Sequence, residues 1–129
     1  MDQATLVEKH IDDGEKLLAS LRSSGFDVTA AAWLKASEDG QWFFYIASAQ
    51  VDRVGLAAAY RTVYLTIQQT QDLWVDPFEI KLIGPNNPIA KDILDILRRY
   101  PARIPTRYRG PRLGSIHIDE AYIYAATTP

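Results

Sequence analysis

Residues 28–49, VTAAAWLKASEDGQWFFYIASA, decide the fold of this chain because they hold two apolar runs joined by a turn signal. The runs, Val28–Ala36 and Gln41–Ala49, flank Ser37–Gly40, and the Asp-Gly pair that ends this linker favours a two-residue β-hairpin turn. The paired residues then lie symmetrically about the Asp-Gly pair. This predicted register places Leu34 opposite Tyr45 and Ala36 opposite Phe43 on one face, and Trp33 opposite Ile46 and Lys35 opposite Phe44 on the other.

Both faces of the predicted hairpin are apolar. A sheet with one face in water should alternate apolar and polar residues, so we expect helices over one face and a second subunit over the other. Trp33, Trp42 and Phe44 are therefore predicted to lie in the core or at a subunit interface. A ligand-stacking platform is the alternative role for these rings.

Further helices and strands are predicted on both sides of the hairpin. An amphipathic helix covers residues 3–24, Gly25 suits a Schellman C-cap, and Gly14 predicts close packing within the helix. The chain then continues with a helix over 54–70 capped by Asp52, a strand over 77–83, a helix from Pro88 to Tyr100 capped by Asn87, and a strand over 115–124 with a bulge near Asp119.

The fold class predicted from this order is α+β. Residues 1–129 form a single domain with the order α-β-β-α-β-α-β and a mixed four-stranded sheet packed with helices. The N-terminal hairpin is antiparallel, and each later strand follows a crossover helix, which favours parallel pairing.

Composition limits the classes of function. The chain has no cysteine, which excludes disulfides and thiolate metal sites. The first residues carry acids where a signal peptide needs bases, and no apolar run approaches roughly 18 residues. We therefore expect a soluble, cytoplasmic protein without membrane contact, and we predict no metal and no cofactor. The chain resembles small bacterial α+β proteins, a likeness that implies no activity.

Charge is segregated along the chain. Residues 98–112 hold six arginines and no acid, although the whole chain has 16 acids and 14 bases. Three prolines keep this stretch out of helices and central strands, so we expect a basic, proline-rich loop over 98–114. Its candidate binding residues are Arg98, Arg99, Arg103, Arg107, Tyr108, Arg109 and Arg112.

Three interpretations of this loop remain open. Its arginines pair with acids of the same chain or of a second subunit, since guanidinium binds carboxylate in a bidentate manner. Alternatively, they hold nucleic-acid phosphates while a tyrosine stacks on a base, although the pI of about 5.6 disfavours this interpretation. The third interpretation is binding of a small anionic ligand or an acidic protein.

The weak catalytic candidates are Glu79 and Lys81, which share a face if residues 77–83 form a strand. Their spacing resembles the Glu-x-Lys of the PD-(D/E)xK nuclease superfamily, in which acids hold a divalent metal and the lysine assists a water. The resemblance implies a metal-dependent nuclease. The preceding acid, Asp76, departs from the pattern of that family because it is only three residues from Glu79 and precedes a proline.

The remaining polar candidates lack partners in the sequence. His10 falls on the apolar side of the first helix, where we expect a packed histidine, and His117 and Asp119 share the polar face of the last strand.

The leading hypothesis for the function is a non-enzymatic, homo-oligomeric binding domain that uses the arginine loop to engage acidic groups. Nucleic-acid binding through that loop and the nuclease centred on Glu79 and Lys81 are the alternatives.

Overall fold

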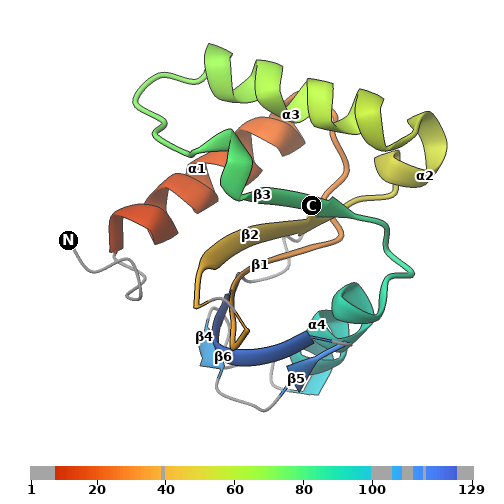
Figure 1. Cartoon of the computed structure of the whole chain (residues 1–129). Coiled ribbons are helices and arrows are strands. Elements are labelled where there is room, and N and C mark those ends of the chain that lie inside the picture. Colours follow the sequence, from red (N-terminus) through yellow and green to blue (C-terminus); the bar gives the residue numbers. More distant parts are fainter. Residues whose placement is uncertain (1–7, 39, 100–105, 109–111, 115, 125–129) are drawn as a thin grey trace.

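The computed structural model describes residues 8–38, 40–99, 106–108, 112–114 and 116–124. The fold is α+β, with a mixed sheet in the strand order β3-β2-β1-β6-β4 and a two-residue strand, β5, that also pairs with β6. Helices α1 and α3 cover one face of this sheet, and α4 covers the other (Figure 1). The described residues thus place five strands side by side in the main sheet, one more than predicted.

The hairpin forms as predicted, but its register is different. Strands β1 (Ala30–Ala36) and β2 (Trp42–Ala47) are antiparallel, and Trp33 lies opposite Phe44 instead of Ile46. The turn is longer than two residues: the Gly40 N–H donates to the Ala36 carbonyl (2.9 Å), and Gly40 has a φ of 66°. Because side chains alternate with a period of two, this two-residue shift keeps each side chain on its predicted face.

Helices of the same chain cover both apolar faces of the hairpin. Trp33, Trp42 and Phe44 are 1%, 7% and 0% exposed and pack in the core beneath α1 (Glu8–Ser23) and α3 (Leu56–Gln69). Leu34 and its neighbours pack beneath α4 (Pro88–Arg99) on the other side. The three rings are thus core residues, and they leave almost no exposed surface for a second subunit to contact.

Helix α1 confirms two local predictions. It ends in a Schellman motif: Gly25 has a φ of 87°, the Phe26 N–H donates to the Leu21 carbonyl (2.9 Å), and the Gly25 N–H donates to the Arg22 carbonyl (3.1 Å). Gly14 packs against the hydroxyl of Tyr124, where a Cβ would collide. That hydroxyl donates to the Ile11 carbonyl (2.7 Å) and accepts from Trp33 Nε1 (3.1 Å).

The predicted second helix is two helices. Helix α2 (Gln50–Val54) ends at Gly55, whose φ of 91° and ψ of 157° are incompatible with a continuous helix, and α3 begins at the next residue. Asp52 lies inside α2, so the prediction that it is an N-cap is wrong. Only glycine adopts this backbone conformation without strain, which explains the position of the break.

Strand β3 (Ile80–Ile83) is parallel to β2, as predicted from the crossover helix. It begins three residues later than expected because the Asp76 carboxylate accepts a hydrogen bond from the Phe78 N–H (2.9 Å) and holds residues Pro77–Glu79 in a 3-10 turn, η1. The Tyr60 hydroxyl accepts from the Leu82 N–H (3.0 Å) and donates to the Ile80 carbonyl (3.4 Å). The Tyr60 side chain therefore provides hydrogen-bond partners for two backbone groups of β3, the Leu82 N–H and the Ile80 carbonyl.

The last strand, β6 (Ile116–Ile123), pairs antiparallel with β1, so the predicted parallel pairing is wrong. β6 does run in the direction of β2 and β3, but its neighbour is β1, which runs the other way. The bulge near Asp119 is confirmed, since Lys35 pairs with Glu120 and Ala36 with Ile118. The Asn87 cap is also confirmed by a hydrogen bond from the Ile89 N–H (2.9 Å).

Part of the predicted loop over 98–114 belongs to the sheet. Strand β4 (Thr106–Tyr108) and strand β5 (Arg112–Leu113) both pair antiparallel with β6. The turn after β5 is attached to α4, because the Gly114 N–H donates to the Asp92 carboxylate (2.6 Å). Among the described residues, no helix is both long and apolar enough to cross a membrane.

Candidate interaction surfaces

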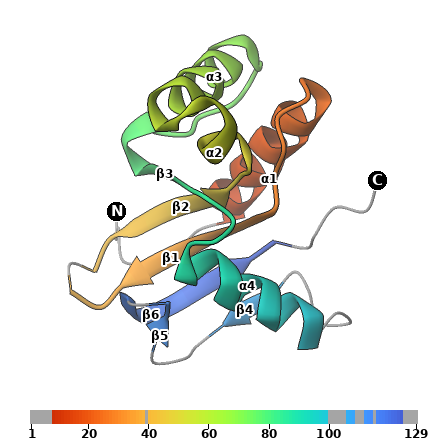
Figure 2. The same cartoon turned by 90° about the vertical axis from the view of Figure 1, so that its right-hand side faces the viewer.

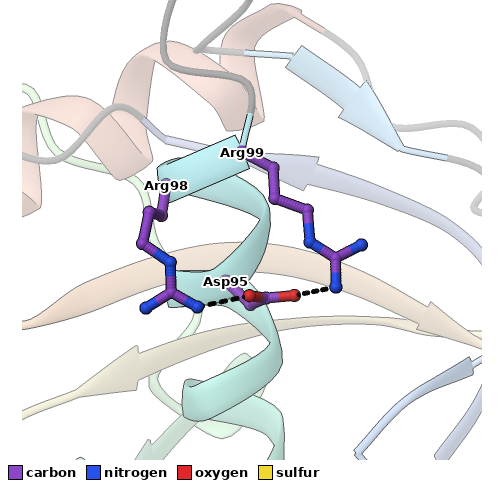
Figure 3. A network of polar contacts seen from close by, with 3 residues as sticks. All are labelled: Asp95, Arg98 and Arg99. Carbon is purple, nitrogen blue, oxygen red and sulfur yellow. Dashed lines mark hydrogen bonds and ion pairs between the residues drawn. The ribbon is translucent and has the colours of Figure 1, made fainter.

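Two of the predicted binding arginines lie at the end of α4. Arg98 Nη2 is 2.6 Å from Asp95 Oδ1, and Arg99 Nη2 is 2.8 Å from Asp95 Oδ2 (Figure 3). The two arginine side chains are 78% and 65% exposed. One carboxylate thus holds two guanidinium groups, and this end of the helix keeps a net positive charge that faces solvent.

The other arginines of the segment are not brought together by the described residues. Arg107 and Tyr108 lie on β4, with Arg107 opposite Tyr122 on β6, and Arg112 is an exposed residue of β5. Arg112 has no ion pair within the described part of the chain. Arg103 and Arg109 lie outside the described residues.

Glu79 and Lys81 do not form the site suggested by their spacing. Glu79 ends η1, where burial and the nearby charge of Asp76 raise the pKa of its carboxyl, while the proximity of His10 on α1 lowers it. Lys81 lies on β3 with its Nζ 4.5 Å from the ring centroid of Phe43, whose ring packs against the core beneath α4. Glu79 therefore lies in the turn before β3, whereas Lys81 lies in the strand itself, over the Phe43 ring.

Neither histidine has a catalytic partner within the part of the chain that the structure describes. The His10 ring packs edge-on against Trp33 at a centroid distance of 5.6 Å, and its buried Nδ1 has no hydrogen-bond partner among the described residues. On β6, the Asp119 carboxylate accepts a hydrogen bond from the Ser37 hydroxyl (2.8 Å), and His117 is exposed. The described residues include no group of three or more acidic or histidine side chains placed to hold a metal ion.

The most unusual surface feature is a pair of aromatic side chains between α3 and β3. Trp74 is 73% exposed and Phe78 is 88% exposed, more than any other large apolar residue described. Leu56, at the start of α3, and Leu65, on the outer side of that helix, are each 49% exposed. Single exposed leucines are common on protein surfaces, but two aromatic rings so far in solvent are not.

The segment that carries the two rings is held firmly. Leu73 and Val75 pack into the core beneath α1 and α3, so the extended chain between them points Trp74 outward. After Val75, the Asp76 cap and the fixed φ of Pro77 form η1, which presents Phe78 to solvent. The conformation of the backbone around Trp74 and Phe78 thus keeps both rings exposed to solvent.

Tyr64 extends this surface along α3. It lies one helical turn beyond Tyr60, its ring centroid is 5.7 Å from that of Tyr60, and it is 37% exposed. Because α3 runs opposite to β3, this turn leads toward η1 (Figure 1). Asp76 and Glu79 add carboxylates, and we call Tyr64, Trp74, Asp76, Phe78 and Glu79 the aromatic–acidic surface.

A groove of about 390 Å³ lies between the C-terminal halves of α1 and α3. Its walls are mostly hydroxyl and amide side chains, and the Thr70 hydroxyl donates to the Ser20 hydroxyl (3.2 Å) across it. Of the residues that the structure describes, no charged or aromatic side chain lines the groove, so it offers little to recognise a specific ligand. Its lining residues are Ala19, Ser20, Ser23, Ser24, Thr66, Gln69 and Thr70.

Sequence reasoning missed the aromatic–acidic surface and assigned interface roles to buried rings instead. A signal was present: Trp74 follows the polar end of a helix and precedes Asp76-Pro77, so it falls in a connection. Aromatic residues in connections have fewer core positions open to them than those in strands.

Comparison of the chain with protein-family models, curated proteins and solved structures gave no match.

Proposed function

We propose that this chain is a non-enzymatic interaction domain that binds another protein through the aromatic–acidic surface. The observation that carries the proposal is the 73% and 88% exposure of Trp74 and Phe78 on a segment fixed by its own core contacts and cap. Exposed aromatic groups of this kind mark interaction sites, and aromatic side chains dominate the energetics of protein interfaces.

The size of the surface fits a specific interaction. An aromatic side chain buries roughly 150–250 Å² when it is fully covered, so the two rings together offer on the order of 400 Å². At about 25 cal/mol per Å² this area is worth several kcal/mol before the costs of association are subtracted. Because the segment is already ordered, little of that energy is lost in fixing it on binding.

The basic segment, residues 98–112, is the second contact region of this proposal. Arg98, Arg99 and Arg112 are exposed cations suited to carboxylates on a partner. The non-enzymatic part of the proposal is supported by the positions of Glu79, in η1, and Lys81, in β3, because the nuclease pattern needs both residues on one face of a strand. We place the protein in the cytoplasm, in keeping with the lack of cysteine.

Site-specific photo-crosslinking tests the function. A photoreactive phenylalanine analogue at position 78 should give a discrete crosslinked protein that unlabelled chain competes away and that Trp74→Ser abolishes. The matched control carries the same analogue at position 65, which is also exposed but lies on the outer side of α3. Equal crosslinking from positions 65 and 78, or none from position 78, would remove the proposal.

A further inference from the structure

The aromatic–acidic surface has the chemistry of a guanidinium-binding site. Its exposed rings, Trp74 and Phe78, each stand two positions from Asp76 in the chain, and Glu79 follows Phe78. Arginine can stack on a ring while it pairs with an acid. The Glu79 carboxyl is partly buried and lies near the negative charge of Asp76, and both effects raise its pKa. A cation bound there would stabilise the ionised form of Glu79.

The same chain carries a segment with the complementary chemistry. Residues 98–112 have six arginines and no acid. At the described start of this segment, Arg98 and Arg99 share the single carboxylate of Asp95 and remain mostly exposed (Figure 3). Arg112, on β5, is also exposed.

The aromatic–acidic surface adjoins β3, the first strand in the spatial order, whereas β4, the described strand within the basic segment, is the last. Helix α4 and η1 also lie on opposite sides of the sheet, as the two views show (Figures 1 and 2). Because the sheet lies between η1 and the end of α4, contact of the aromatic–acidic surface with Arg98 or Arg99 requires two molecules.

We propose that the aromatic–acidic surface binds the basic segment, residues 98–112, of a second copy of this chain, so that molecules associate head to tail. This inference rests on the proposed function, because it names the partner of the same surface. A contact between two different patches is heterologous, and it builds a ring or an open chain of molecules instead of a two-fold dimer. Attraction between the acidic and basic patches makes the association sensitive to salt.

Sedimentation velocity tests this association directly. At about 100 µM protein and about 20 mM salt, the mass should exceed the 14.5 kDa of one chain. It should return to the monomer mass at about 0.5 M salt. A chain that stays at 14.5 kDa under both conditions would overturn the inference.

Two variants with damaged halves test the head-to-tail geometry. The first, Trp74→Ser with Phe78→Ser, lacks the aromatic half, and the second, Arg98→Gln with Arg99→Gln and Arg112→Gln, lacks basic residues. Each alone should associate at least roughly tenfold more weakly than the natural chain. An equimolar mixture should recover a one-to-one complex, because each variant keeps the half that the other has lost.

Other results would contradict this geometry. If the arginine variant alone still associates while its mixture with the aromatic variant gains nothing, the aromatic surface pairs with itself, and the inference fails. Leu65→Ser is the control, since it removes an equally accessible apolar side chain outside the surface and should leave association unchanged. If the chain is monomeric but Phe78 crosslinks to a different protein, the proposed function stands without this inference.

Discussion

The Tyr60 hydroxyl is predicted to stabilise the outer edge of the sheet, and Tyr60→Phe removes this group while keeping the ring. The hydroxyl accepts from the Leu82 N–H at 3.0 Å and donates to the Ile80 carbonyl at 3.4 Å. The first bond has good geometry and the second is long, so the loss is mainly that of one hydrogen bond. An N–H group left without a partner in a partly buried site costs about 1–2 kcal/mol.

The expected loss of stability can be measured by urea unfolding monitored by circular dichroism. Tyr60→Phe should lower the midpoint without changing the slope, because the surface exposed on unfolding stays the same. For a chain of this length, 1–2 kcal/mol corresponds to a fall in Tm of roughly 3–8 °C. The Leu82 amide should also exchange its hydrogen faster in the variant, since its partner is absent.

Tyr64→Phe is the matched control for this experiment. Tyr64 lies on the same helix one turn away, and its hydroxyl has no hydrogen-bond partner among the described residues. Its replacement should change stability by less than about 0.5 kcal/mol. If the two variants unfold at the same urea concentration and the Leu82 amide stays protected from hydrogen exchange, the Tyr60 hydroxyl does not stabilise β3 through these hydrogen bonds.

Three further predictions follow from the packing and the charges. Gly14→Ala should destabilise the fold by about 1–3 kcal/mol in thermal unfolding, because the new Cβ collides with the Tyr124 hydroxyl; a gain in stability, as expected from helix propensity alone, would contradict this packing. Trp74→Phe should remove most of the tryptophan emission quenched by acrylamide, since Trp33 and Trp42 are buried; quenching that survives would place Trp74 in the interior. In gel-shift assays at low salt, the chain should bind neither DNA nor RNA; a shift whose log–log salt slope approaches roughly −5 would instead favour phosphate contacts by the arginines of residues 98–112.

The local structure of this protein could be predicted from sequence wherever a single residue imposes a local geometry. Gly25 ends α1 because only a residue tolerant of positive φ fits the Schellman motif, and Asn87 caps α4 because its side chain reaches the free N–H of Ile89. The apolar faces of the hairpin also followed from the alternation of side chains. A two-residue error in register left this last prediction intact.

Tertiary structure decided which strands are neighbours and which aromatic rings are buried. The sequence predicts a strand over 115–124, but only packing places it beside β1, where its pairing becomes antiparallel. In the same way, Trp33 and Trp74 are equally apolar in the sequence, yet one is 1% exposed and the other 73%. Burial depends on which helices cover a side chain, and those contacts join residues far apart in the chain. The sequence by itself therefore determined the longer helices, the hairpin and their apolar faces, whereas the tertiary structure decided the strand order, the short strands β4 and β5, and the surface left open to a partner.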